Sequence, residues 1–187
     1  MSDPLLDRLT TIPPYRSGAV ISDCGKYRYL LWRAWDPHKP TVAFIGFNPS
    51  TADATMDDPT IRKCIGFADR LGFGALEMLN LFAYRSPDPA ALWWNVPHVK
   101  EPIGSHNDAA LEYALIRCRT AVAAWGAISV PTRARRILRE RIDLVHRLAS
   151  NHGHSTLACL GRTKAGHPRH PLYVPYTTEL EPWRPNA

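Results

Sequence analysis

The sequence lacks the features that mark several broad classes of protein. It has no Cys-x-x-Cys pair, and no ligand set with a recognisable spacing predicts a metal or a cofactor. No apolar run is long enough to span a membrane, and the first residues mix charge with proline instead of forming a signal peptide. We therefore expect a cytoplasmic protein with no membrane partner. Its dispersed cysteines are expected to be buried, reduced thiols: Cys24, Cys64, Cys118 and Cys159.

The chain does contain enough apolar sequence for one folded domain. It has 187 residues, of which 45% are hydrophobic. Residues 1–22 show little periodicity, which predicts an irregular amino-terminal arm before a single domain over residues 23–187. The net charge is +6 and most basic residues are arginines, which favours anionic partners and nucleic acid above others. We expect the protein to be a monomer.

The hydrophobic pattern alternates between strands and helices. Short, continuous apolar runs indicate buried parallel strands, and apolar residues at helical spacing separate them. A further segment, 26–35, alternates aromatic and basic residues, which indicates an antiparallel strand exposed on one face. The pattern predicts a three-layer α/β/α domain with a mostly parallel four-stranded sheet and an antiparallel edge strand. The predicted parallel strands are 42–45, 76–84, 120–125 and 156–160, and the predicted helices are 59–71, 105–118 and 131–150.

Two asparagines stand where buried strands end. Asn48 follows the first strand, and Pro49 stops the hydrogen-bonded ladder there, so Asn48 is expected to project from the carboxyl end of the strand. Ligands bind at that edge in open α/β sheets. Asn80 interrupts the next apolar run, so its amide must either find partners in the core or lie at the strand end. Together these carboxamides predict a site for one planar ligand. The loop closes on Asp58, which is predicted to cap a helix starting at Pro59.

Two other segments concentrate positive charge. Helix 131–150 carries Arg133 and Arg136 in its basic amino-terminal half, and Arg141 lies off its apolar stripe. This helix is either a solvated surface with acidic partners or a face that contacts phosphates. Loop 161–173 combines glycines, prolines, histidines and cationic side chains directly after a buried strand, which predicts a rigid binding loop.

Three motifs stand at the predicted strand ends: Gly46-Phe47-Asn48-Pro49-Ser50, Leu79-Asn80 and Gly166-His167-Pro168-Arg169-His170-Pro171-Leu172. They resemble motifs of the uracil-DNA glycosylase superfamily, and the strand end Ala124-Trp125-Gly126 is similar as well. The asparagine in the first motif looks closest to the mismatch-specific uracil and thymine branch. The strings GFNPSTA, DDPT, NLFAYRS and LGRTKAGHPRHPLY also look like those of a bacterial and phage family of unknown function, over residues 27–175.

The resemblance implies a role for each motif residue. Asn48 would position a water for attack on the anomeric carbon, and Asn80 would hydrogen-bond the Watson–Crick edge of an extruded base. His167 would support the departing base anion. Leu172 or His170 would fill the gap left in the base stack. The first loop would contact the substrate through Gly46, Phe47, Pro49 and Ser50, and Arg162, Lys164 and Arg169 would hold the phosphates. The charge of helix 131–150, apart from the resemblance, adds Arg133 and Arg136 as candidate phosphate contacts.

The sequence departs from the superfamily pattern in two places. Arg169-His170 stands where the superfamily has a single serine, and residues 54–59 lack the aromatic that stacks on uracil. Asp57 and Asp58 in that stretch offer a carboxylate instead, either as a general base or as a contact to polar groups of a modified base. Turn and cap chemistry is the structural alternative for both aspartates.

These features predict a DNA base glycosylase-like enzyme. It would cleave the N-glycosidic bond of a flipped base, modified or damaged, in DNA that is single-stranded or modified. One alternative is a non-catalytic module that binds modified or damaged nucleic acid. Another is an enzyme that acts on a free nucleotide or nucleoside, in which case the basic helix would be incidental.

Overall fold

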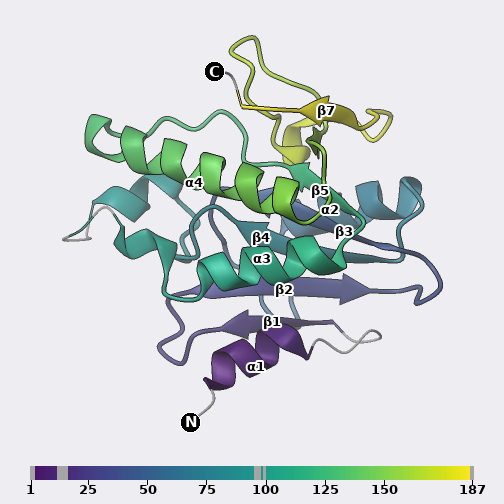
Figure 1. Cartoon of the computed structure of the whole chain (residues 1–187), viewed down its shortest axis with the longest axis horizontal. Helices are drawn as coiled ribbons and strands as arrows, with labels where there is room; N and C mark the ends of the chain where they lie inside the picture. Colours follow the sequence, from purple (N-terminus) through teal and green to yellow (C-terminus); the bar gives the residue numbers. More distant parts are fainter. Residues whose placement is uncertain (1–2, 12–16, 95–97, 99, 186–187) are drawn as a thin grey trace.

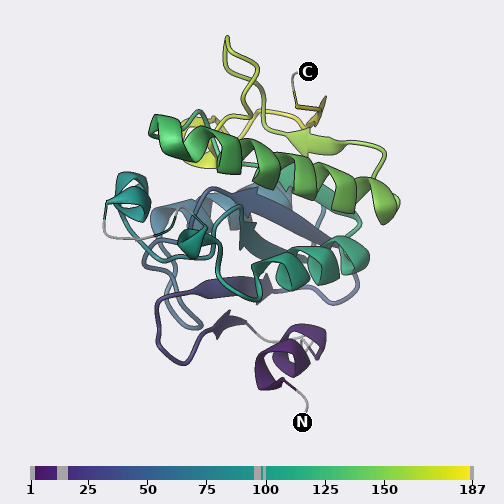
Figure 2. The ribbon, with the colours of Figure 1, turned by 60° about the vertical axis from the view of Figure 1, so that its left-hand side comes forward.

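One mixed β-sheet organises the domain. In the computed structural model, residues 3–11, 17–94, 98 and 100–185 are described, and within them a 7-stranded sheet has the order β1-β2-β4-β3-β5-β6-β7. β1 and β7 therefore form opposite edges of the sheet (Figures 1 and 2). The strands are β1 Gly18–Ile21, β2 Arg28–Ala34, β3 Thr41–Gly46, β4 Ala75–Asn80, β5 Thr120–Ala123, β6 Leu157–Cys159 and β7 Glu181–Trp183.

The centre of the sheet is parallel, as the apolar runs predict. β3 pairs in parallel with β4 on one side and with β5 on the other, and β5 pairs in parallel with β6. β1, β2 and β7 are antiparallel to their neighbours. The expected parallel strands are confirmed. The prediction for the antiparallel strand 26–35 was wrong in detail, because β2 pairs with β4 and is covered by β1 instead of forming the edge.

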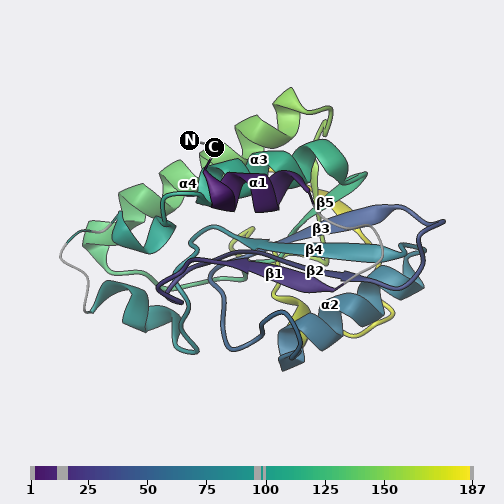
Figure 3. The ribbon, with the colours of Figure 1, turned by 90° about the horizontal axis from the view of Figure 1, so that it is seen from below.

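Helices cover both faces of the sheet and make three layers (Figure 3). α2, Pro59–Arg70, packs on one face with a core that includes Phe44 and Phe67. The opposite face is covered by α1 Pro4–Thr10, α3 Asn107–Arg117 and α4 Thr132–Asn151. Short 3-10 helices lie in the connections: η1 Pro89–Trp93, η2 Glu101–Ile103 and η3 Pro171–Tyr173.

The amino-terminal segment is ordered into the domain, so the prediction of an irregular arm over residues 1–22 was wrong for its described part. Asp3 caps α1 by accepting a hydrogen bond from the Leu5 backbone N–H at 3.0 Å. Leu9 is fully buried in the core, and Arg117 of α3 donates to its carbonyl oxygen. β1 adds directly to β2. Elements this short carry too little periodicity to be recognised, and the Asp3-Pro4 start of α1 is the one local signal that could have revealed that helix.

Two other structural expectations can be checked directly. Cys64, Cys118 and Cys159 are buried free thiols, whereas Cys24 is free but exposed in a turn, contrary to the prediction. Within the described residues, no helix is long and apolar enough to cross a membrane.

Candidate functional site

A pocket of about 620 Å³ opens where the parallel strands end. It is lined from the loops that follow β3 and β5, from the end of β4 and from the loop before η3. β3 lies between β4 and β5, and the loop after β3 leads to α2 on one face while the loop after β5 leads to α4 on the other. The crevice where connections diverge in this way is the usual ligand site of an open α/β sheet. The volume is typical of small-molecule sites.

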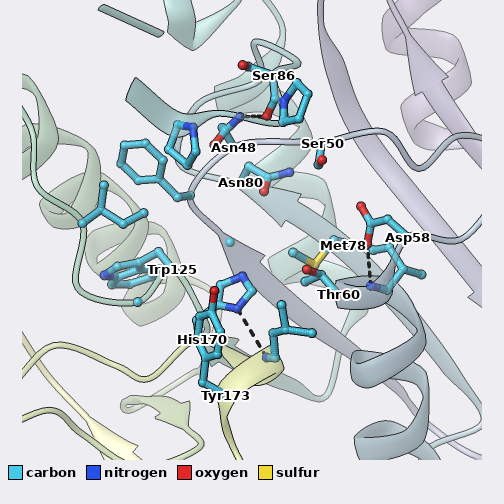
Figure 4. A pocket seen from close by; sticks show the side chains of 18 of the residues that line it. Asn48, Ser50, Asp58, Thr60, Met78, Asn80, Ser86, Trp125, His170 and Tyr173 are labelled. Atoms are coloured by element: carbon cyan, nitrogen blue, oxygen red, sulfur yellow. Dashed lines mark hydrogen bonds between the residues drawn. The ribbon is translucent and has the colours of Figure 1, made fainter. Parts of the chain in front are cut away.

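The structure brings together many of the residues that the sequence singles out, but not all of them. Asn48 and Asn80 lie on one wall and face His170 across the pocket, with Trp125 on one flank and Thr60 on the other (Figure 4). The predicted residues that line the pocket are Gly46, Phe47, Asn48, Ser50, Asp58, Asn80, Arg169, His170 and Leu172. Those outside its lining are Pro49, Asp57, Arg133, Arg136, Arg162, Lys164 and His167.

Asn48 is held in one orientation by backbone carbonyls. Its Nδ2 donates to the carbonyl oxygens of Pro49 at 3.0 Å, Tyr84 at 3.4 Å and Ser86 at 2.8 Å. If the amide were rotated by 180°, its oxygen would face these carbonyl oxygens and repel them. The hydrogen-bond network therefore decides which side-chain atom is Nδ2 and which is Oδ1. Oδ1 accepts no hydrogen bond from any described residue. Asn48 therefore offers the pocket a fixed acceptor.

Asn80 is a buried amide without a partner. Its side chain is 1% exposed, and neither Oδ1 nor Nδ2 forms a hydrogen bond within the described part of the chain. Gly46 lies beside it in the parallel ladder, and a Cβ at Gly46 would lie 2.8 Å from Oδ1. Glycine is thus required next to the amide. Burying an unpartnered amide costs free energy, which points to a ligand that satisfies it.

Two buried polar residues fix the backbone that carries Asn80. Asn107 donates from Nδ2 to the carbonyl oxygens of Asn80 at 3.0 Å and Leu81 at 3.1 Å. Arg141 donates from Nε to the Leu81 carbonyl oxygen at 2.9 Å and pairs with Asp108. The helical pattern placed Arg141 off the core stripe, but this arginine is 4% exposed. No local signal reveals that a carbonyl pair at a strand end will need these donors.

His170, not His167, is the histidine of the pocket. Its Nδ1 accepts a hydrogen bond from the Leu172 backbone N–H at 3.3 Å and so caps η3. Burial lowers the pKa of His170 below its ordinary value, and the nearby Asp58 carboxylate opposes that shift only in part. The imidazole is therefore neutral at pH 7. Because Nδ1 is an acceptor, the ring proton sits on Nε2, which is a donor.

The loop after β6 turns His167 away from the pocket. The Thr163 backbone N–H donates to the His167 carbonyl oxygen at 2.8 Å, and the backbones of Arg162 and Pro168 pair as an isolated antiparallel β-bridge. These contacts close a narrow hairpin. His167 is exposed and lines a second hollow instead. Of the two histidines in this loop, His170 is therefore the one that a ligand in the pocket can reach.

Of the two candidate aspartates in the first loop, Asp58 lines the pocket and Asp57 does not. Asp57 forms an ion pair with Arg33 at 2.8 Å and does not line the pocket, so its geometry fits the structural alternative. Asp58 caps α2 by accepting from the Ile61 backbone N–H at 2.9 Å, and it also lines the pocket. The predicted cap at Asp58 and Pro59 is confirmed.

Most of the basic residues chosen from the sequence are already engaged or lie apart from the pocket. Arg162 pairs with Glu181 at 3.2 Å, and Lys164 is exposed. Arg169 lines the pocket and donates from Nε to the Arg162 carbonyl oxygen. On α4, Arg133 donates to the Trp93 carbonyl oxygen and Arg136 pairs with Glu140.

The pocket also contains residues that the sequence did not single out as site residues. Trp125 and Tyr173 supply the aromatic surface that the stretch 54–59 lacks. Arg28 lines the pocket although it is 2% exposed, because the loop after β3 covers β2 on the face that the sequence pattern predicted to be solvent-exposed. Burial lowers the pKa of Arg28 to about 10, with Asp58 opposing the shift, so the guanidinium stays charged at pH 7. Among the described residues, no three His, Cys, Asp or Glu side chains gather as a metal site would need.

Fold and pocket together define an α/β protein with a polar, aromatic-lined pocket at the topological switch point of its sheet. The chain belongs to the family described as "Protein of unknown function (DUF1643)", whose model matches residues 28–172. That range includes every residue named above as lining the pocket except Tyr173. Neither the curated proteins nor the solved structures contain a significant match to the chain.

Proposed function

We propose that this protein is a hydrolase of the DNA base glycosylase type, with the uracil-DNA glycosylase-like architecture that its motifs imply. One observation carries the proposal. The free acceptor oxygen of Asn48 and the unpartnered amide of Asn80 lie on one wall of the same pocket. The first can orient a water, and the second can read the edge of a base. A site that cleaves the bond between a base and its sugar needs both groups next to each other.

The reaction follows from these positions. A water held by Asn48 Oδ1 attacks the anomeric carbon, and a new carbon–oxygen bond forms. The glycosidic carbon–nitrogen bond breaks, and its electron pair leaves with the base. Nε2–H of the neutral His170 and Nδ2 of Asn80 are the donors that stabilise the negative charge on the departing base. The proton lost by the water passes to solvent, and the base is reprotonated after release.

The aromatic and charged parts of the pocket suit a flipped nucleotide. Tyr173, which is exposed, offers a ring surface on which an unstacked base can lie, and the largely buried Phe47 and Trp125 complete the aromatic lining. Arg169 stands at the same pocket and can contact a phosphate of the flipped nucleotide. Arg28 and Asp58 supply a buried cation and an anion for polar groups on the base, which favours a modified base over an unsubstituted one.

Mass detection of released base tests this function. The protein is incubated with DNA that carries natural and phage-type modified bases, and free base and abasic sites are both measured. The proposal requires release of at least one base with an equal amount of abasic sites. If DNA is bound but no base is released from any substrate, the pocket belongs to a non-catalytic binding module. Release only from free nucleosides would instead indicate an enzyme of small-molecule metabolism.

The pH dependence of base release provides a separate prediction. The ordinary pKa of histidine is 6.5, and that of His170 is lower because of burial. Protonation places a second proton on Nδ1, which can then no longer accept the Leu172 N–H that holds the ring in place, so only the neutral form keeps the productive orientation. The neutral form predominates above pH 6.5 and is lost as pH falls through the lower pKa. We expect single-turnover rates to be flat from neutral pH upward and to fall below it, with a midpoint under 6.5. In His170→Asn the remaining rate should lack that acidic limb. A wild-type rate that rises on acidification would contradict a neutral His170.

A further inference from the structure

A second hollow, of about 850 Å³, adjoins the pocket. It lies between α4 and the loop after β6, and Ile128 lines both the hollow and the pocket. The loop after β6 also joins them, because Gly166 and His167 line the hollow whereas Arg169 and His170 line the pocket. The two hollows are therefore neighbours that share a wall.

The hollow combines an apolar floor with a cationic rim. Ile128, Leu138 and Ile142 are half-buried and form the floor. Arg135 and Arg139 stand one helical turn apart on α4, and both are exposed. Within the described part of the chain neither arginine forms an ion pair or a side-chain hydrogen bond, in contrast to Arg133 and Arg136. Asp143 is the acidic group in the lining.

The wall opposite α4 is rigid. Trp183 is buried and donates from Nε1 to the Gly166 carbonyl oxygen at 3.0 Å. Arg162 ties the start of the same loop to β7 through its ion pair with Glu181. The backbone that carries His167 is therefore held at the hollow by contacts that do not depend on a ligand, and the imidazole joins the two arginines in the lining. The hollow is preformed.

We propose that the second hollow binds the nucleotide next to the flipped one, with its base on the apolar floor and its phosphate on Arg135 and Arg139. The inference rests on the proposed function, since it takes the pocket to hold a base. Charge complementarity selects a phosphate backbone as the occupant of a rim with two unpaired arginines. Two adjoining hollows accept two neighbouring bases only when neither is stacked in a duplex. The substrate strand is therefore single-stranded at this point.

Paired arginine variants test the inference. Arg135→Ala/Arg139→Ala removes the rim, and Arg70→Ala/Arg147→Ala removes the same charge from exposed helix positions outside the hollow. Binding of a fluorescein-labelled single-stranded oligonucleotide and of a fully paired hairpin is measured by anisotropy between about 50 and 200 mM salt. We expect the rim variant to lose roughly tenfold or more in single-strand affinity, and its log–log salt slope to fall by about 0.7, the contribution of the one phosphate that the rim would neutralise.

Each outcome decides the matter. The inference stands if the rim variant loses much more single-strand affinity than the control variant and if the wild type prefers the single strand over the hairpin. It is overturned if the two variants lose affinity equally, if neither loses any, or if the hairpin is preferred. Anisotropy does not depend on catalysis. Failure to release any base would therefore refute the proposed hydrolase while leaving the binding result readable, and base release with full affinity in the rim variant would refute only the inference.

Discussion

Alanine at position 48 is expected to lower the rate of base release by about 10²–10⁴-fold, the usual effect of losing a positioned water or proton acceptor. The only acceptor atom of the Asn48 side chain is Oδ1, and the carbonyls of Pro49, Tyr84 and Ser86 hold it in place through Nδ2. Affinity for DNA should change little, because the base edge and the phosphates are contacted by other residues. Rates are measured in single turnover on the released-base substrate, and affinity by anisotropy.

Folding must be separated from chemistry in this variant. Asn48→Ala leaves carbonyls without their donor, so we expect destabilisation of about 1–2 kcal/mol, visible in thermal melting. Asn151→Ala, which removes an exposed asparagine at the end of α4, is the matched control and should keep both rate and stability. A folded Asn48→Ala protein with a wild-type rate would show that the water is not held there.

The second large effect is a pair of opposite changes in stability. Asn80→Leu should stabilise the fold by about 1–2 kcal/mol, because it removes a buried amide that has no partner. Asn107→Leu should destabilise it by about 1–3 kcal/mol, because it leaves the Asn80 carbonyl oxygen without its donor. Both asparagines are buried, so each variant is the control for the other. Thermal or urea unfolding measures the two values.

The same Asn80→Leu variant should lose function while it gains stability. Base release and selectivity among bases should both fall, since leucine cannot hydrogen-bond a base edge. Such a trade-off marks a group retained for binding and not for folding. If Asn80→Leu proves strongly destabilising instead, the amide serves the core, and the satisfied-core interpretation of this asparagine would be correct.

The parallel core of the fold was readable from sequence because its signals are local. The run at 42–45 is continuously apolar and is bounded by Pro40 and Gly46, and β3 covers Thr41–Gly46. The start of α2 is likewise marked by two adjacent residues, the N-cap Asp58 and Pro59 at the first helical position. The positions of Asn48 and Asn80 followed from these elements, because the carboxyl ends of parallel strands meet at one edge.

Features that depend on contacts between distant segments could not be read in the same way. The loop after β6 contains two His-Pro pairs, and their sequence does not show which histidine enters the pocket. The hairpin closed by Thr163 and His167 places His170 there. Arg28 looked like a solvent-facing member of an alternating strand, yet a loop more than twenty residues away covers it and accepts its hydrogen bond at Ala52. Arg141 looked solvated because it lies off the apolar stripe of its helix, yet it is buried and donates to the Leu81 carbonyl oxygen, which is distant in sequence.

Whether a nucleobase sits in the pocket with its edge against Asn80 is tested most directly by the side-chain amide signal of Asn80 in ¹⁵N–¹H NMR spectra. The signal is assigned by its absence from Asn80→Leu, and the protein is titrated with free nucleobases and with a single-stranded oligonucleotide. We expect the Asn80 amide protons to shift markedly as they gain an acceptor. The Asn107 amide, already bonded to two carbonyls, should hardly move. An Asn80 signal that stays in place while the oligonucleotide binds would contradict a base pocket at this site.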